Sequence, residues 1–248
     1  MTCRRFLMCA LMAVVAQSPV SALTIDWAGH TWQVNTGYPM GGRTAGQIDG
    51  RADNVFVDGR GRLHLDIRGS GATATGAEVS TVDNMSFGSF YYVVSGPIMS
   101  MEPSVVFSGF TYGPANGVGG DGTDELDIEF SRWNGVDGNI DGDFTFYPAS
   151  GEQKHGDSFT TNWLLDLGNV NTCRIDWTPS SVTASIWAGD VPPTASTTTA
   201  VKTATFHGTS KTVPQEAMPM MFNLWTNGAY PTKALDVVVD KFQYIPRR

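Results

Sequence analysis

The sequence has 248 residues, enough for one domain with a full hydrophobic core, and 41% of its residues are hydrophobic. Its 24 acidic residues outnumber its 16 basic residues and give a formal net charge of -8 at pH 7. A surface of this sign disfavours nucleic acid, anionic membranes and polyanionic ligands as partners, and it leaves neutral polymers open.

The N-terminal segment has the organisation of a secretory signal peptide. Two arginines precede an apolar run over residues 6–16, which is too short to span a bilayer, and small residues at 20–22 form a cleavage site. We therefore expect cleavage after Ala22 and a single mature domain, residues 23–248, that is secreted or periplasmic. The segment carries two of the basic residues and none of the acidic ones, so its removal would change the net charge from -8 to -10. Cys173 is then the only cysteine left, and no internal disulfide is expected.

The remaining sequence is typical of short β-strands separated by turns rich in Gly, Asn, Asp and Pro. No segment longer than a few turns has helical periodicity. Many short strands at this spacing predict an all-β fold in which two antiparallel sheets pack as a sandwich of the jelly-roll kind. The expected strands lie, in chain order, within 54–67, 76–82, 88–94, 104–112, 125–130, 143–147, 173–177, 181–187, 202–206, 220–225 and 236–245.

The stretch DELDIEF at 124–130 alternates acidic and apolar residues. On a strand, Glu125, Asp127 and Glu129 share one face and the apolar residues point to the other. Like charges two positions apart repel, so this arrangement costs stability unless a function uses it. Glycoside hydrolysis is such a function, because it needs one ionised carboxylate to attack the anomeric carbon and one protonated carboxyl to donate to the leaving oxygen. A solvated strand face and a calcium-binding cluster are the alternatives that the heptapeptide leaves open.

This motif and its surroundings resemble glycoside hydrolase family 16, whose signature is E-[apolar]-D-[apolar]-(x)-E. The stretches SVVFSGFTY, CRIDW, MPMMFNLWTNG and DVVVDKFQYI resemble other strands of the family and occur in its order, over nearly all of 24–246. The resemblance implies a concanavalin-like jelly roll. It also implies that Glu125 is the nucleophile, Asp127 a helper and Glu129 the acid/base.

The same resemblance implies a retaining endo-β-glucanase that acts as a monomer on a polysaccharide and requires no cofactor. The motif lacks the extra residue that many laminarinases carry before the second Glu, as in lichenases, which favours mixed-linkage β-1,3-1,4-glucan as the substrate. Two alternatives stay open. One is another β-glycan hydrolase or a transglycosylase acting on the producer's own exopolysaccharide, and the other is a non-catalytic glycan-binding jelly roll.

Sugar rings pack on aromatic side chains while their hydroxyls need polar partners. We therefore expect substrate contacts from four aromatic and two polar side chains: Phe110, Tyr112, Phe146, Trp225, Glu78 and Asn223. Phe110 and Phe146 are equally compatible with a place in the core. Glu78-Val79-Ser80 departs from the Glu-x-Arg that is common in lichenases, and the loop directly before the acidic motif holds no Trp.

A structural calcium ion is the remaining expectation from the family. Many family members hold such an ion on the outer face, and Asp240 and the Gly61 carbonyl occupy the matching positions here. Oxygen ligands of this kind suit a hard cation.

Overall fold

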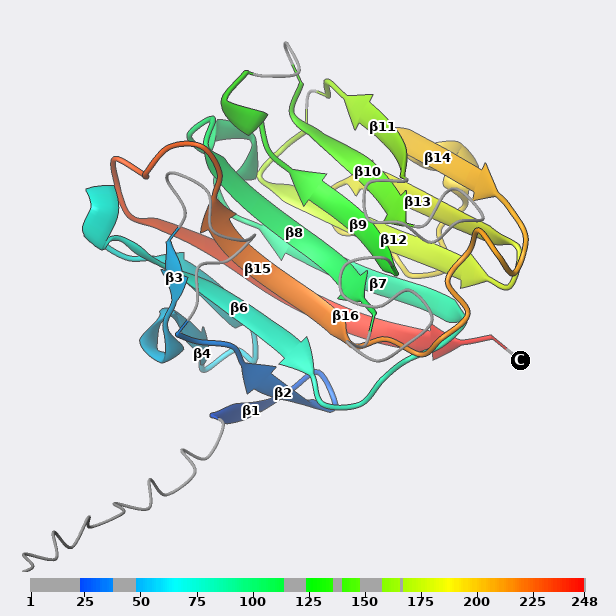
Figure 1. The fold of residues 1–248 in the computed structure, drawn as a ribbon, viewed down its shortest axis with the longest axis horizontal. Helices are drawn as coiled ribbons and strands as arrows, with labels where there is room; N and C mark the ends of the chain where they lie inside the picture. Colours follow the sequence, from blue (N-terminus) through cyan, green and yellow to red (C-terminus); the bar gives the residue numbers. More distant parts are fainter. Residues whose placement is uncertain are drawn as a thin grey trace, which may run out of the picture.

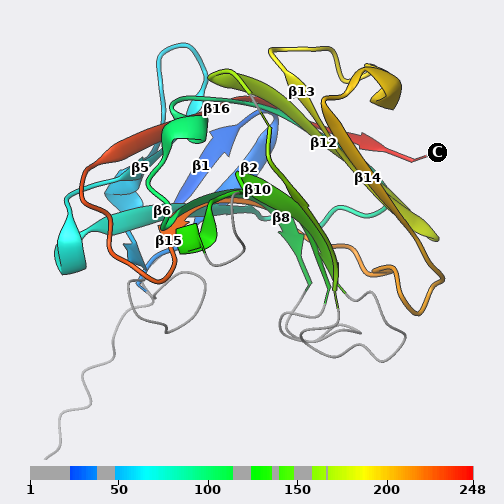
Figure 2. The same ribbon diagram turned by 90° about the horizontal axis from the view of Figure 1, so that it is seen from above.

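The computed structural model describes residues 23–37, 48–113, 124–135, 140–147, 158–165 and 167–247. Within these ranges the chain forms two β-sheets that stack as two layers (Figure 1). Seen on edge, both sheets bend in the same sense (Figure 2). The expected all-β sandwich is confirmed.

The first layer, here called the front sheet, has nine strands among the described residues, and β9 is flanked by β8 and β10. All its pairings are antiparallel except that of β3 with β6. Its strands, in spatial order, are β1 (Thr24–Trp27), β2 (His30–Val34), β6 (Thr75–Thr81), β15 (Met220–Thr226), β8 (Val105–Tyr112), β9 (Glu125–Phe130), β10 (Gly142–Tyr147) and β11 (Phe159–Trp163), with β3 (Asp49–Gly50) beside β6.

The second layer, the back sheet, has seven antiparallel strands in the described ranges. They are β14 (Lys202–His207), β13 (Ser181–Ala188), β12 (Val170–Thr178), β7 (Gly88–Ser95), β16 (Leu235–Pro246), β5 (Leu63–Ile67) and β4 (Val55–Val57). Short 3₁₀ turns join some strands: η1 (Ala52–Asn54), η2 (Gly71–Thr73), η3 (Ile98–Ser100), η4 (Trp133–Gly135) and η5 (Thr197–Thr199). No helix in the described part of the chain is long and apolar enough to cross a membrane.

The core lies between the two sheets and is rich in aromatic rings. Phe222 on β15 stacks on Trp32 of β2 at 5.5 Å and meets Tyr92 of the back sheet edge-on at 5.1 Å. All three side chains are fully buried. Burial of one such side chain contributes about 1.5–3 kcal/mol, so this cluster fixes how the layers face each other.

The core also determines the orientation of β9. Leu126, Ile128 and Phe130 are fully buried and belong to the inter-sheet core. Because successive side chains on a strand alternate between faces, Glu125, Asp127 and Glu129 must point to the outer face of the front sheet. A one-residue shift in register would bury all three carboxylates in the core, so the apolar residues specify this register strongly.

Candidate active site

The three acidic residues of β9 lie in the middle of a patch of cross-strand neighbours. Glu125 is paired with Tyr112 on β8 and with Tyr147 on β10. Asp127 is paired with Phe110 and Thr145, and Glu129 with Ser108 and Asp143, on the same two strands. Directly paired residues on adjacent strands have Cβ atoms about 4.5–5.5 Å apart, so these side chains contact one another on the outer face.

Glu129 has a polar neighbour on each side. The Ser108 hydroxyl donates to Glu129 Oε1 at 2.9 Å. On the other side, a hydrogen bond with the Asp143 carboxyl raises the pKa of Glu129. The pKa of Glu129 lies well above its ordinary value, chiefly because burial disfavours the charged form and next because of the charge of Asp143. Glu129 is therefore suited to hold a proton and to act as a general acid.

Asp127 is almost fully buried, at 4% exposure, between the two glutamates. Burial raises its pKa well above the ordinary value, and the charges of Glu125 and Glu129 raise it further. Asp127 also forms a hydrogen bond with Glu125. A protonated Asp127 can thus donate to the Glu125 carboxylate and orient it, which fits the expected helper role.

Polar residues continue from β9 across the outer face toward β6. Asn223 on β15 is paired with Ser108 and with Glu78, so it lies between β8 and β6. Asn223 Nδ2 donates to Glu78 Oε2 at 3.4 Å, and Asn35 Nδ2 donates to Glu78 Oε1 at 3.0 Å. Asn223 Oδ1 is buried and has no hydrogen-bond partner among the described residues. The expected polar pair, Glu78 and Asn223, is brought together, and Asn35 is an additional member that the sequence did not predict.

The aromatic expectations have different outcomes. Phe110 is 7% exposed, lies outside the inter-sheet core and shares the outer face with Asp127, and Tyr112 shares it with Glu125. Trp225 has the same facing as Asn223 on β15, but it is 8% exposed and belongs to the cluster of buried hydrophobic residues. Its indole N–H has no hydrogen-bond partner in the described part of the chain. The Trp133 ring meets the Trp225 ring edge-on at 6.3 Å. Trp133 was not predicted as a site residue, although it follows Glu129 by only four positions.

Phe146 does not belong to the site, and the expectation that it contacts substrate is wrong. It is paired with Leu126, so it points to the core face of the front sheet. Its side chain is 1% exposed, and its ring stacks on Phe159 at 5.7 Å. The alternating pattern of β10 is the physical reason, because Asp143, Thr145 and Tyr147 occupy the opposite face.

Each of the two expected calcium ligands has another partner in the structure. The Gly61 carbonyl accepts a hydrogen bond from Trp27 Nε1 at 2.8 Å, and Asp240 forms an ion pair with Arg62 at 3.7 Å. A guanidinium beside the carboxylate opposes a second cation by like-charge repulsion. No group of three acidic, His or Cys residues in the described ranges is arranged to hold a metal. The expected site used one carboxylate and one backbone carbonyl, and both already have partners here, so the structural calcium stays a prediction.

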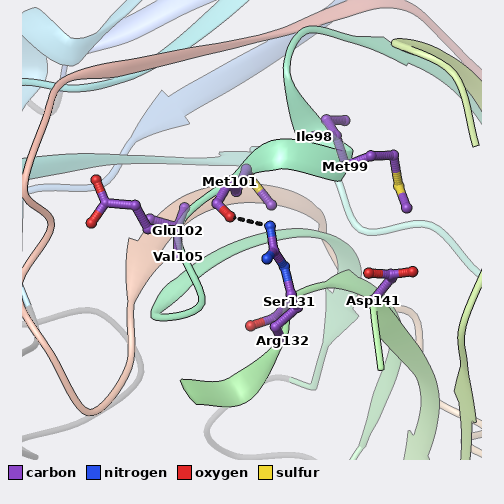
Figure 3. Close-up of a pocket in the computed structure, with 8 residues that line it drawn as sticks. All are labelled: Ile98, Met99, Met101, Glu102, Val105, Ser131, Arg132 and Asp141. Atoms are coloured by element: carbon purple, nitrogen blue, oxygen red, sulfur yellow. Dashed lines mark hydrogen bonds between the residues drawn. The ribbon is translucent and has the colours of Figure 1, made fainter. Parts of the chain in front are cut away.

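A small pocket lies close to the end of β9, between η3 and the residues just after β9 (Figure 3). The Arg132 guanidinium reaches across it and donates to the Met101 carbonyl at 2.5 Å (Figure 3). The pocket has about 10 Å³ of space. This is the volume of about one water molecule, so the pocket is too small for a sugar residue. The acidic face of β9, and not this pocket, is the candidate active site.

Neither a family model nor a curated protein sequence matches the chain. Several solved structures do match it. A Bacillus licheniformis beta-glucanase is 23% identical, with 87% of this chain and 92% of that chain covered at a TM-score of 0.63. A glycoside hydrolase family 16 endo-glucanase from Bacteroides ovatus is 17% identical, with 86% and 94% covered at a TM-score of 0.64.

A third match cautions against equating fold with activity. It is a Mycobacterium tuberculosis protein described as an immunostimulatory antigen and pseudo beta-1,3-glucanase, 17% identical, with 88% of this chain and 91% of that chain covered at a TM-score of 0.63. At such identities the likeness shows the fold alone. The chain has the jelly-roll fold of glycoside hydrolase family 16, as the resemblance of its motifs predicted.

Proposed function

We propose that the protein is a retaining endo-β-glucanase that hydrolyses internal bonds of a β-glucan. The observation that carries the proposal is the carboxylate row on the outer face of β9, in which the pKa of Glu129 is raised well above its usual range. The family 16 fold supports it. A binding protein with no catalytic role would not need three repelling acids side by side on one strand face.

The chemistry assigned to these residues is a double displacement. The Glu125 carboxylate attacks the anomeric carbon, and the bond from that carbon to the glycosidic oxygen breaks while Glu129 gives its proton to the leaving oxygen. Water then attacks the glycosyl-enzyme, Glu129 takes a proton from that water, and the Glu125 carboxylate is released. Asp127 donates a hydrogen bond to Glu125 and keeps it oriented through both steps.

The preferred substrate in this proposal is mixed-linkage β-1,3-1,4-glucan. The motif has the uninterrupted E-x-D-x-E spacing. A solved structure of the same fold is a Bacteroides ovatus family 16 protein from a mixed-linkage-glucan locus, with its product G4G4G3G bound. Phe110, Tyr112 and Trp225 supply rings for sugar faces, and Asn35, Glu78 and Asn223 supply groups for sugar hydroxyls. The leader at residues 1–22 would direct the enzyme out of the cytoplasm to its polymer.

A substrate panel tests this function. Purified protein is incubated with barley β-glucan, lichenan, laminarin, cellulose and agarose, and new reducing ends and product sizes are measured. We expect internal cleavage of barley β-glucan and lichenan at a higher rate than of laminarin. Proton NMR of the first products, before mutarotation, should show the β-anomer. A protein that binds these glucans but releases no reducing ends would be a glycan-binding jelly roll, and an initial α-anomer would contradict the roles of Glu125 and Glu129.

A further inference from the structure

Asp143 is a fourth carboxyl in the site, and the double displacement does not use it. It lies on β10 directly opposite Glu129 and is 4% exposed. Trp133 Nε1 donates to Asp143 Oδ2 at 2.8 Å, and Thr145 Oγ1 donates to Asp143 Oδ1 at 2.8 Å. Each carboxyl oxygen of Asp143 therefore has a donor of its own, on a strand and a turn that flank β9.

These donors determine which of the two carboxyls carries the proton. Hydrogen bonds from N–H and O–H groups favour the charged form of a carboxyl. Asp143 accepts two such bonds, so it is the member of the pair that is stabilised as the anion. Glu129 is then the member that stays protonated, and it donates a hydrogen bond to Asp143. This bond raises the pKa of Glu129.

The neighbour of Glu129 on β8 has the opposite effect on the pKa of Glu129. Ser108 on β8 donates to Glu129 Oε1, and this bond lowers the pKa of Glu129. The remaining carboxyls near Glu129 are Asp127 and Glu125 on its own strand, and the other β8 positions on this face are Phe110 and Tyr112. Tyr147 on β10 is uncharged at neutral pH, because burial raises its pKa to about 12.

We propose, on the basis of the glucanase function above, that Asp143 is a positioning residue that holds Glu129 in its protonated form and aims it, and that Ser108 opposes it from the other side. Asp143 acts through Glu129 and does not contact the reacting atoms. The two flanking strands thus set the pH range over which the acid is available.

A purely structural role for Asp143 makes a different prediction. Its bond to Trp133 could serve only to anchor that ring, which packs against Trp225. Loss of the anchor would weaken substrate binding and raise KM, and it would leave the pH dependence of kcat/KM unchanged. The pH profile of kcat/KM therefore distinguishes a positioning role of Asp143 from a purely structural one.

The experiment measures kcat/KM on barley β-glucan against pH for wild type, Asp143→Asn, Ser108→Ala and a charge-matched control, Asp83→Asn. Asp83 is exposed in a turn after β6. The alkaline limb of this profile reports the ionisation of the acid in the free enzyme. In Asp143→Asn we expect that limb to move down by about one pH unit or more, because an amide can donate to the Glu129 carboxylate and carries no charge. In Ser108→Ala it should move up, and in Asp83→Asn it should stay in place.

Two further measurements keep the test decisive. If Asp143→Asn fails to fold, Thr145→Val leaves the carboxyl in place and removes one of its donors, and the limb should again move down. Carbon-13 NMR titration of the Glu129 carboxyl, assigned by comparison with Glu129→Gln, gives the same shift without any turnover. Unchanged Glu129 titration in Asp143→Asn and Thr145→Val would overturn the role of Asp143 even in an active glucanase. A wild type that cleaves no glucan but shows the NMR shift would contradict the proposed function and leave the coupling of Asp143 to Glu129 in place.

Discussion

Glu125 and Glu129 are the residues on which the proposed chemistry depends. Each is expected to lose most activity when replaced by Gln, because an amide can neither attack the anomeric carbon nor donate an acidic proton. Turnover in Glu125→Gln and Glu129→Gln should fall by at least about 10²- to 10⁴-fold. Both variants should stay folded, because an amide has nearly the size and shape of the carboxyl that it replaces.

Release of reducing ends from barley β-glucan, together with the far-UV circular dichroism spectrum, checks this expectation. Asp83→Asn serves as the control, because it removes one charge from an exposed turn. Turnover close to wild type in either Gln variant, from a preparation free of native enzyme, would show that other groups catalyse the reaction.

The sequence predicted the acidic row at residue level because the information is local. Three acids alternate with three apolar residues, and the core confirms that period. Asp143 and Asn35 could not be predicted in this way, because their roles depend on which strands pair and in what register. Phe146 was misassigned for a related reason. In a short run such as DFTFY, either set of alternating side chains could point to the core. Only the pairing with Leu126 shows that Phe146 points inward.

At the scale of the strand, β8 supports the site through Gly109. This glycine lies between Ser108 and Phe110, on the face turned toward the back sheet. A Cβ at Gly109 would lie 2.5 Å from the Tyr92 hydroxyl and the same distance from its Cζ, and Tyr92 is fully buried. Gly109→Ala should therefore reduce the free energy of unfolding by about 1–3 kcal/mol or more.

Urea unfolding measures this loss. Gly59→Ala is the matched control, because its added methyl would meet nothing within 4 Å among the described residues. The control should unfold within about 0.5 kcal/mol of wild type, as most surface substitutions do. Equal stability of the two variants would mean that Tyr92 moves aside without cost.

Asp124, the residue just before β9, makes the free energy of unfolding depend on pH. Asp124 is 2% exposed, and its Oδ1 is buried without a hydrogen-bond partner in the described ranges. Burial and the charge of Glu216 raise the pKa of Asp124 to about 6. Because this pKa is higher in the folded than in the unfolded chain, the stabilisation is present below about pH 4 and is lost as the pH rises through about 6.

Asp124→Asn should remove this loss of stability at higher pH, because an amide does not ionise. Relative to wild type, we expect the variant to gain up to about 3 kcal/mol in unfolding free energy between pH 4 and pH 7.5. Chemical denaturation at both pH values measures the difference. The same pH dependence in both proteins would show that Asp124 does not ionise in this range.

The strands were predicted where their apolar alternation is strong. β6 to β10 and β12 to β16 all match an expected segment. β1, β2 and β11 were missed, because TIDW, HTWQV and FTTNW are short and hold several polar residues. β1 and β11 lie at the two edges of the front sheet, and β2 lies next to β1, so less of their surface needs to be apolar.

At the scale of the whole molecule, the two sheets have different roles in forming the core and the site. The back sheet and the inner face of the front sheet form the core, while the outer face of the front sheet carries the carboxylates and most of the expected sugar contacts. The strand order places β15 between β6 and β8, so residues as far apart in sequence as Glu78 and Asn223 become neighbours. This long-range pairing is the reason that the extent of the site could not be derived from any one motif.

The N-terminal strand tests where the folded domain begins. β1 brings Trp27 into the core, where it is 5% exposed, donates to the Gly61 carbonyl and lies 5.5 Å from the Trp32 ring. A protein that begins at Leu23 keeps all of these contacts, and we expect it to unfold with the same midpoint as the product of the proposed cleavage after Ala22. A protein that begins at Ala28 loses β1 and its tryptophan, and its unfolding free energy should fall by about 3–5 kcal/mol, as for removal of a buried aromatic ring. Guanidinium unfolding of the two purified proteins gives the comparison, and Edman sequencing of the exported protein should read Leu-Thr-Ile. Equal stability of both truncated proteins would mean that β1 contributes nothing to the core.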